Sequence, residues 1–412
     1  MERGLRLLCI SQFFYPDSLG GVERVVYETM RELAARGHEI DLVGQRTKPG
    51  TPDVERLFGF TVHRYGSAES RRRFGGRTRD ALYESRRVIA PLLAERSFDI
   101  VVPHHYFPYH AYARVARRKT LPEVMTFHAS FWQELKLEGA DRPIGKPLES
   151  LLFGGLARRT EIDCLKRADR VLVLSDFSKD QLLSYYPFAE AKVMKIAGGV
   201  DLERFHPAPD RLAVRRELGL PLDRPILFTA RRLVPRMGIE RLIEALAQVR
   251  KTHPGVVLVI AGRGRMEGRL RRLVAEHSLG ESVRFIGFVD DPALVRYYQA
   301  ADLFILPSLA FEGFGMVTLE ALACGTPAIG TPIGATPEIL LPLAPQLVLD
   351  GVEPSAIRRG IQIMLEWLSD ADAAEKLRAR CREYVSARYG WAPVVDALET
   401  LFEDLVRGKR SG

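Results

Sequence analysis

The sequence has 412 residues, of which 46% are hydrophobic and 27% are charged, and its formal net charge is +8. This composition is ordinary for a globular protein and excludes a disordered chain or a fibre. The length predicts two compact domains. No apolar run approaches the roughly 18 residues of a membrane-spanning helix, and the N-terminus lacks the apolar stretch of a signal peptide. We therefore expect a cytoplasmic protein.

The positive charge is concentrated near the N-terminus, where residues 1–119 contain 21 Lys and Arg against 14 Asp and Glu. Clusters lie at residues 71–73 and 114–119. No nucleic-acid-binding signature accompanies them, so nucleic acid is not expected. A solvated face, an acidic acceptor or the inner face of an anionic membrane remain as explanations.

In chain order, strand-like apolar runs alternate with amphipathic helical runs, which predicts a parallel sheet covered on both faces. The first set of expected strands is LRLLCIS, HEIDLVG, FTVHRY, FDIVV, EVMTFH and RVLVLS. Around residues 199–211 the pattern gives way to a linker rich in Gly, Pro and Asp. The second set is PILFTA, VVLVIAG, VRFIG, DLFILPS and TPAIG, followed from about residue 353 by helices alone.

Two segments combine glycines or arginines with a strand-to-helix transition. Gly20 and Gly21 follow the first strand and open a helix, where free amides and the helix dipole favour an anion. Arg231, Arg232 and Arg236 follow the strand ILFTA, in a position to hold phosphates. Neither half carries the G-x-G-x-x-G fingerprint, which disfavours a nicotinamide dehydrogenase.

A third segment is rich in glycine, and a fourth combines glycines with two carboxylates. Gly262, in AGRGR, allows a ligand close to the backbone. Glu312 lies in the glycine-rich loop FEGFG, and Glu320 follows eight residues later inside the apolar run VTLEALA. An unpaired buried carboxylate is costly, so we expect the hydroxyls of a sugar or ribose to satisfy Glu320. The alternative is a Glu320 that faces solvent.

Together these segments resemble the retaining nucleotide-sugar glycosyltransferases of family 4, which have the GT-B fold. The strongest element is Glu312-x7-Glu320 within PSLAFEGFGMVTLEALACGTPAIG. The segments RLVPRMGIERLIEA, VIAGRGR, FIGFVDDPALVRYYQAADLFILPS and GGVDLERFHP also resemble the family, and the likeness covers nearly the whole chain. It implies two doubly wound Rossmann-like α/β domains facing each other across a cleft. These are an acceptor-binding domain (1–205) and a nucleotide-sugar-binding domain (206–388). A C-terminal helix (389–412) is expected to pack back on the first domain.

The resemblance also implies residue roles. Arg232 would bind phosphate, Glu320 the ribose hydroxyls and Glu312 the transferred sugar, while His128 would lie near that sugar. With Arg236, the residues Arg232, Glu312 and His128 form the expected catalytic set. The expected donor-binding set is Gly20, Gly21, Arg232, Arg236, Gly262, Val289, Glu312, Phe314, Gly315, Met316, Val317 and Glu320. Phe131 and Trp132, in the segment 129–150, are the expected acceptor platforms.

The sequence departs from the family at Met237, where the family usually has a lysine. Arg236 is our predicted substitute for that cation, with Arg231 and Arg265 as the next candidates. A second departure is Gly198, which stands where the family has an asparagine.

Neither a cofactor nor a metal ion is expected, because arginines and a helix dipole can neutralise the leaving diphosphate. The sequence Asp370-x-Asp372 resembles a metal motif, but its place at the polar start of a helix favours a surface cap. Cys9, Cys164, Cys324 and Cys381 are widely spaced, which predicts free buried thiols.

The predicted activity is transfer of a sugar from a nucleoside diphosphate donor to an acceptor hydroxyl, with retention at the anomeric carbon. The acceptor would be a glycan, a glycolipid or a lipid-linked precursor. Two alternatives remain open. One is a sugar-phosphate synthase or phosphorylase-like enzyme of the same fold, and the other is a catalytically silent protein that binds sugar nucleotides.

Overall fold

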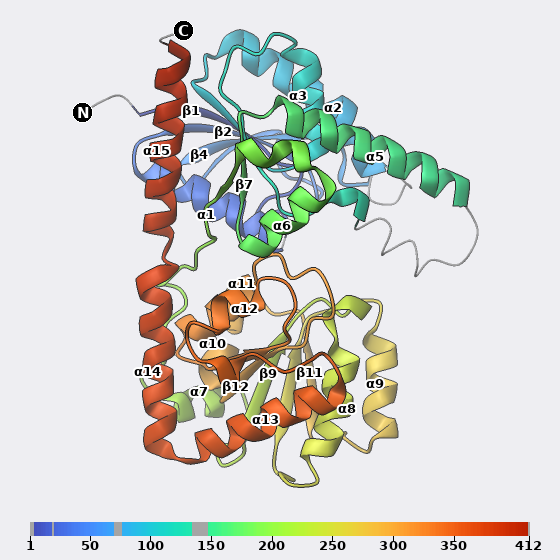
Figure 1. Cartoon of the computed structure of the whole chain (residues 1–412), viewed down its shortest axis with the longest axis vertical. Helices are drawn as coiled ribbons and strands as arrows, with labels where there is room; N and C mark the ends of the chain where they lie inside the picture. Colours follow the sequence, from blue (N-terminus) through green and yellow to red (C-terminus); the bar gives the residue numbers. More distant parts are fainter. Residues whose placement is uncertain (1–3, 19, 70–75, 134–146, 411–412) are drawn as a thin grey trace. The chain divides into compact units, whose positions relative to one another are not determined.

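The computed structural model describes residues 4–18, 20–69, 76–133 and 147–410. The chain forms two compact units. Unit 1 comprises Met1–Gly198 and Trp391–Gly412, and unit 2 comprises Gly199–Gly390. Figure 1 shows the elements of both units, coloured along the sequence.

Unit 1 is built around a five-stranded sheet with the order β3-β4-β2-β1-β5 and a three-stranded sheet with the order β6-β7-β8. Neighbouring strands are parallel except β3 and β4. The strands are β1 (Arg6–Ile10), β2 (Glu39–Gln45), β3 (Val54–Leu57), β4 (Phe60–Tyr65), β5 (Ile100–Pro103), β6 (Val124–Thr126), β7 (Arg170–Val173) and β8 (Val193–Lys195). A bridge between Val101 and Glu123 joins the two sheets.

The sequence pattern predicts six of these strands but misses β3 and β8. Both strands are largely exposed or half-buried, so neither has a continuous apolar run. The β3-β4 hairpin turns at Phe58 and Gly59, which both have a positive φ, as a tight two-residue hairpin turn requires.

Unit 1 also contains the last helix of the chain. Its helices are α1 (Gly21–Ala35), α2 (Gly76–Glu95), α3 (Tyr106–Val115), α5 (Pro147–Arg167), α6 (Asp176–Tyr185), the short η2 (Pro187–Lys192) and α15 (Trp391–Arg410). Helix α15 packs along α1 (Figure 1). Arg36, just after α1, forms ion pairs with Asp396 and Glu399 of α15, and His38 bonds Glu399 at 2.8 Å. The C-terminal helix is therefore an integral part of unit 1.

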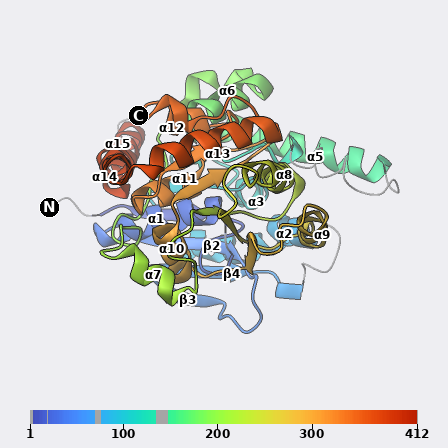
Figure 2. The same ribbon diagram turned by 90° about the horizontal axis from the view of Figure 1, so that it is seen from below.

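Unit 2 is a second doubly wound unit with a fully parallel sheet in the order β11-β10-β9-β12-β13. Its strands are β9 (Ile226–Ala230), β10 (Val257–Ala261), β11 (Val283–Gly287), β12 (Leu303–Leu306) and β13 (Ala328–Gly330). Its longer helices are α7 (Arg211–Glu217), α8 (Ile239–Val249), α9 (Glu267–Glu276), α10 (Asp291–Ala300), α11 (Met316–Ala323), α13 (Pro354–Ser369) and α14 (Ala371–Arg388). The short elements are η3 (Pro235–Met237), α12 (Thr336–Leu340) and η4 (Pro345–Leu347). Helices α8 and α13 pack together (Figure 2).

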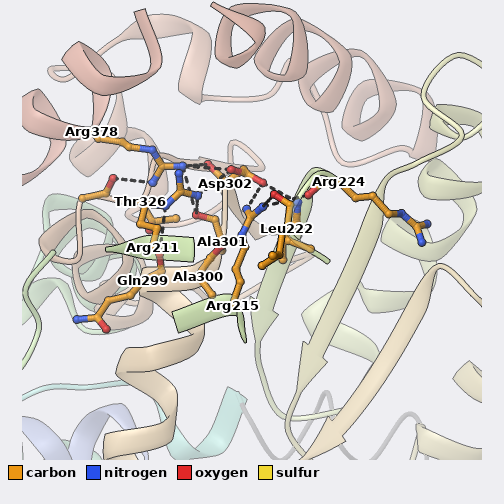
Figure 3. A network of polar contacts seen from close by, with 12 residues as sticks. Arg211, Arg215, Leu222, Arg224, Gln299, Ala300, Ala301, Asp302, Thr326 and Arg378 are labelled. Atoms are coloured by element: carbon orange, nitrogen blue, oxygen red, sulfur yellow. Dashed lines mark hydrogen bonds and ion pairs between the residues drawn. The ribbon is translucent and has the colours of Figure 1, made fainter. Parts of the chain in front are cut away.

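One half-buried carboxylate ties the helices of unit 2 to the start of its central strands. Asp302 precedes β12 and contacts Arg211 at 2.7 Å, Arg215 at 2.5 Å and Arg378 at 3.5 Å (Figure 3). It also accepts the backbone N–H of Ile226 at 2.7 Å. The network joins α7 and α14 to β9 and β12 at their amino ends, away from the ends at which ligands bind in such sheets.

The predicted α/β class is confirmed, with a parallel Rossmann-like sheet in each unit. The four cysteines are free and buried, as predicted. Asp370 caps α14 by accepting the N–H groups of Asp372 and Ala373, which confirms the interpretation of this motif as a cap. Within the described ranges, no helix is long and apolar enough to cross a bilayer.

Candidate active site

The carboxyl ends of two neighbouring strands in unit 2 bring an arginine and a glutamate into contact. Arg231 directly follows β9, and Glu312 lies in the loop after β12, which pairs with β9. The Arg231 guanidinium forms an ion pair with Glu312 and donates a hydrogen bond to Ser308 Oγ at 3.1 Å. Ser308 donates to the same Glu312 oxygen, Oε2, at 2.8 Å. Glu312 is only 7% exposed, so this carboxylate is buried and held by two donors.

Glycines allow the surrounding loops to converge at this point. A Cβ atom on Gly262 would lie 1.8 Å from the carbonyl oxygen of Arg231. One on Gly334 would lie 2.0 Å from the carbonyl oxygen of Glu312, and one on Gly238 would lie 1.8 Å from that of Pro307. All three glycines also have positive φ. Close packing between loops thus accounts for Gly262, for which the sequence suggested approach of a ligand.

Glu320, the second carboxylate of the pair, is buried within α11. It is 7% exposed, which excludes the solvent-facing alternative. Tyr298 of α10 donates its hydroxyl hydrogen to Glu320 Oε2 at 2.9 Å. The protein itself therefore supplies a partner that the sequence analysis assigned to a ligand. Helix α11 begins after Gly315, whose φ of +87° places it in the left-handed region.

The cations expected to bind phosphate differ in their surroundings. Arg232 is exposed, and within the described ranges its side chain makes no ion pair. Arg236 is half-buried and donates to the carbonyl oxygen of Phe311 at 3.3 Å. Met237, which stands where the family has a lysine, is 6% exposed, and its Sδ lies 2.9 Å from Arg231 Nη2.

The remaining expected donor residues of unit 2 lie in loops and at the start of a helix. Val289 is half-buried between β11 and α10. Phe314 is buried, with its ring 6.2 Å from that of Tyr389. Met316 and Val317 form the first turn of α11 and are half-buried.

In unit 1, Gly20 and Gly21 lie at the start of α1, as predicted from the sequence. An acidic residue of the same turn already approaches them. A Cβ atom on Gly20 would lie 2.3 Å from Glu23 Oε2, and Glu23 Oε1 accepts a hydrogen bond from Ser18 at 3.1 Å. An anion bound at this helix terminus would have to compete with the Glu23 carboxylate.

His128 belongs to a cluster of three histidines in unit 1. Its Nε2 lies 3.2 Å from His104 Nδ1, and the two rings stack with centroids 5.5 Å apart. Burial, and then the neighbouring His104 and His105, holds the pKa of His128 well below 6.5. Burial also lowers the pKa of His104 to about 3 and that of His105 to about 4. His128 is therefore neutral near pH 7. The cavity beside His104 is only about 30 Å³, which is too small for a sugar.

Phe131 and Trp132 are fixed by a carboxylate that sequence reasoning missed. Glu161 accepts hydrogen bonds from the Trp132 backbone N–H and from Ser130 Oγ, both at 3.0 Å, and from the Tyr186 hydroxyl. Its place within α5 carries no recognisable signal. Ser308 and Tyr298 were also missed, because nothing in the sequence shows that they face the two glutamates. The expected acceptor segment continues into residues 134–146, which lie outside the described residues.

Family models and individual relatives both identify proteins that this chain resembles. Residues 19–204 match the family model described as Glycosyltransferase Family 4, and residues 210–388 match the model described as Glycosyl transferases group 1. A D-inositol 3-phosphate glycosyltransferase of Catenulispora acidiphila is 29% identical over 402 residues, which cover 95% of this chain and 92% of that protein.

Two further proteins show a likeness in sequence and in structure. A GDP-mannose-dependent monoacylated alpha-(1-6)-phosphatidylinositol monomannoside mannosyltransferase of Corynebacterium glutamicum is 35% identical over 216 residues, or 50% of this chain and 55% of that protein. The solved structure of a sucrose-phosphate synthase from Thermosynechococcus elongatus has a TM-score of 0.79 at 24% identity. The match covers 98% of this chain and 100% of that one, and it supports the fold.

The fold, the site and the family models point to the same family. The chain forms two doubly wound units, it carries a buried glutamate pair beside a glycine-rich loop, and a family model matches each half. The chain belongs to glycosyltransferase family 4, group 1, and is a retaining GT-B glycosyltransferase that takes its sugar from a nucleotide donor.

Proposed function

We propose that this enzyme transfers a hexose from a nucleoside diphosphate sugar to a hydroxyl of a glycan, glycolipid or lipid-linked precursor. The observation that carries the proposal is the pair of buried carboxylates, Glu312 and Glu320. Each is oriented by a buried protein donor, Ser308 or Tyr298, near the glycine-rich start of α11. Oriented carboxylates near a helix N-terminus without a side-chain cap suit a ligand that carries both hydroxyls and phosphates.

Unit 2 would bind the donor. Glu320 would accept the ribose hydroxyls, Glu312 the hydroxyls of the transferred sugar, and the backbone of Val289 would contact the base. The backbone from Phe314 to Val317 would contact the sugar and diphosphate, with Gly262 nearby. Gly20 and Gly21 of unit 1 would approach the diphosphate.

The chemistry then breaks the bond between the anomeric carbon and the diphosphate oxygen. Negative charge develops on the leaving diphosphate, where Arg232 and Arg236 would stabilise it. The acceptor hydroxyl oxygen forms its new bond on the same face of the sugar, so the configuration is retained, and its proton passes to the departing diphosphate oxygen. His128 is neutral, so it would contribute a hydrogen bond near the sugar rather than a positive charge.

Unit 1 would bind the acceptor, with Phe131 and Trp132 as its aromatic wall. A phosphorylated polyol is a second candidate acceptor, because the relative from Catenulispora acidiphila is named for D-inositol 3-phosphate. The excess of basic residues in unit 1 suits an acidic acceptor or peripheral contact with an anionic membrane.

The test is a thermal-shift screen with UDP, GDP and ADP and with UDP-glucose, GDP-mannose and ADP-glucose. A ligand at 100 times its dissociation constant stabilises the folded protein by about 2.7 kcal/mol. We expect one base to raise the melting temperature and Glu320→Ala to abolish the shift. If none of the six compounds shifts the wild type, the proposed donor class is wrong.

A further inference from the structure

The contacts of Arg231 connect Glu312, the carboxylate proposed to bind the sugar, with the unusual Met237. The Arg231 side chain is 8% exposed, and one of its nitrogens, Nη2, contacts Glu312, Ser308 and Met237. Ser308 donates to the same glutamate oxygen at 2.8 Å. The carboxylate of Glu312 is thus fixed through Oε2. Its other oxygen, Oε1, lies beside the start of α11, 3.8 Å from where a Cβ atom on Gly315 would be.

The side chain of Met237 is compatible with a position beside this arginine. Its thioether is neutral and a weak hydrogen-bond acceptor, so it can lie 2.9 Å from a guanidinium nitrogen at no electrostatic cost. A lysine at the same buried position would bring its ammonium group against the guanidinium. Two like charges with little water between them repel strongly. Arg231 and a lysine at position 237 are therefore mutually exclusive.

We propose that Arg231 is a positioning residue of the donor site, which holds Glu312 toward the transferred sugar and takes over the space and the charge of a lysine at position 237. This inference rests on the proposed function, in which Glu312 binds the sugar. It also explains why position 237 needs a neutral side chain. Replacement of the family's lysine by Arg236 as a phosphate ligand would not by itself explain this.

The test is a charge-swap cycle with Arg231→Gln, Met237→Lys and the double variant. Release of nucleoside diphosphate is measured with UDP-glucose, GDP-mannose and ADP-glucose. Each single change should lower kcat roughly ten-fold or more, the usual effect of losing or misplacing a charge-assisted hydrogen bond. The double variant should have a higher kcat than either single variant, because the added lysine can then occupy the place of the guanidinium. Arg272→Gln, which removes an exposed arginine of α9, is the matched control and should keep the wild-type kcat.

Two outcomes would overturn the proposal. One is a Met237→Lys enzyme as active as the wild type, and the other is a double variant no better than the worse single variant. A purely structural role would lower the melting temperature of Arg231→Gln without recovery of kcat in the double variant.

A second arm, urea denaturation without substrate, separates this inference from the proposed function. Met237→Lys should lower the denaturation midpoint in the wild-type background and lower it less in the Arg231→Gln background. Equal effects in both backgrounds would refute the exclusion between the two cations. If the wild type consumes none of the three nucleotide sugars, the proposed function fails, while this arm still decides whether the two cations exclude each other.

Discussion

Tyr298 on α10 donates its hydroxyl hydrogen to Glu320 on α11 over 2.9 Å, in a part of unit 2 where both side chains are buried. Burial, and then the charge of Glu320, raises the pKa of Tyr298 well above 10, so the phenol remains a donor at any physiological pH. The tyrosine thereby fixes the orientation of the Glu320 carboxylate through Oε2.

Glu320→Ala should weaken donor binding more than it lowers turnover, because ribose contacts are the same in the ground state and the transition state. Glu312→Ala should instead mainly lower kcat. Steady-state kinetics and calorimetric titration with the nucleoside diphosphate separate the two effects. If both variants lose binding and turnover in the same proportion, the two roles are wrongly divided.

Arg236→Ala should lower kcat at least roughly ten-fold, because a charge-assisted hydrogen bond is worth about 1.5–3 kcal/mol. Its hydrogen bond to the Phe311 carbonyl oxygen is 3.3 Å long. Arg232→Ala provides the reference for loss of a phosphate ligand. An Arg236→Ala enzyme with wild-type kcat beside an inactive Arg232→Ala enzyme would show that Arg236 does not contact the diphosphate.

Strands with buried apolar runs could be predicted from the sequence, whereas β3 and β8 could not. Their side chains are largely exposed or half-buried and carry no apolar period. In the candidate site, the spacing of Glu312 and Glu320 could be recognised, but their partners could not. Ser308 and Tyr298 reach the glutamates through tertiary packing, and the contact between Arg231 and Met237 depends on a loop geometry that spacing does not encode.

Turnover should persist in excess EDTA. The expected charge stabilisation comes from Arg232, Arg236 and the amides at the start of α11. The Asp370 side chain caps α14 by accepting the N–H of Asp372, so we interpret the Asp370-x-Asp372 sequence as a helix cap. The assay compares the EDTA-treated enzyme with samples to which Mg²⁺ or Mn²⁺ is returned. A loss of activity that either ion restores would show that the reaction needs a metal.

Unit 1 should bind anionic lipid vesicles weakly and in a salt-dependent manner. Arg114, Arg117 and Arg118 are exposed at the end of α3 and in the loop after it, and residues 71–73 add charge outside the described part of the chain. Flotation with phosphatidylglycerol vesicles at low and high salt measures the effect. Changing the three described arginines to Gln should reduce the bound fraction. Equal flotation with neutral and anionic vesicles would mean that the charge is only solvated.

Unit 1 should lose stability as the pH falls below 6.5. Burial lowers the pKa of His104 to about 3 in the folded state, so the unfolded chain binds a proton in a range where the folded chain does not. The linkage amounts to about 2 kcal/mol at pH 5. Thermal denaturation of the wild type and of His104→Gln at pH 7 and pH 5 tests this. An equal loss in both proteins would contradict it.

In unit 2, burial alone would raise the pKa of Asp302, but Arg211 and Arg215 outweigh it and keep that pKa below its usual value of 3.8. The stability that Asp302 contributes is therefore complete above pH 3.8 and is lost only as the pH falls further. Unit 1 should consequently begin to lose stability at a higher pH than unit 2.

The central claim is that Glu312 serves catalysis and not only binding. The most direct measurement is nucleoside diphosphate release by the wild type and by Glu312→Gln, with the nucleotide sugar that stabilises the wild type and with glycan, glycolipid and inositol phosphate acceptors. The account predicts acceptor-dependent turnover by the wild type, at least roughly ten-fold slower turnover by Glu312→Gln, and similar nucleotide affinity in both. A wild-type protein that binds the nucleotide tightly but releases no product with any of these acceptors would contradict it.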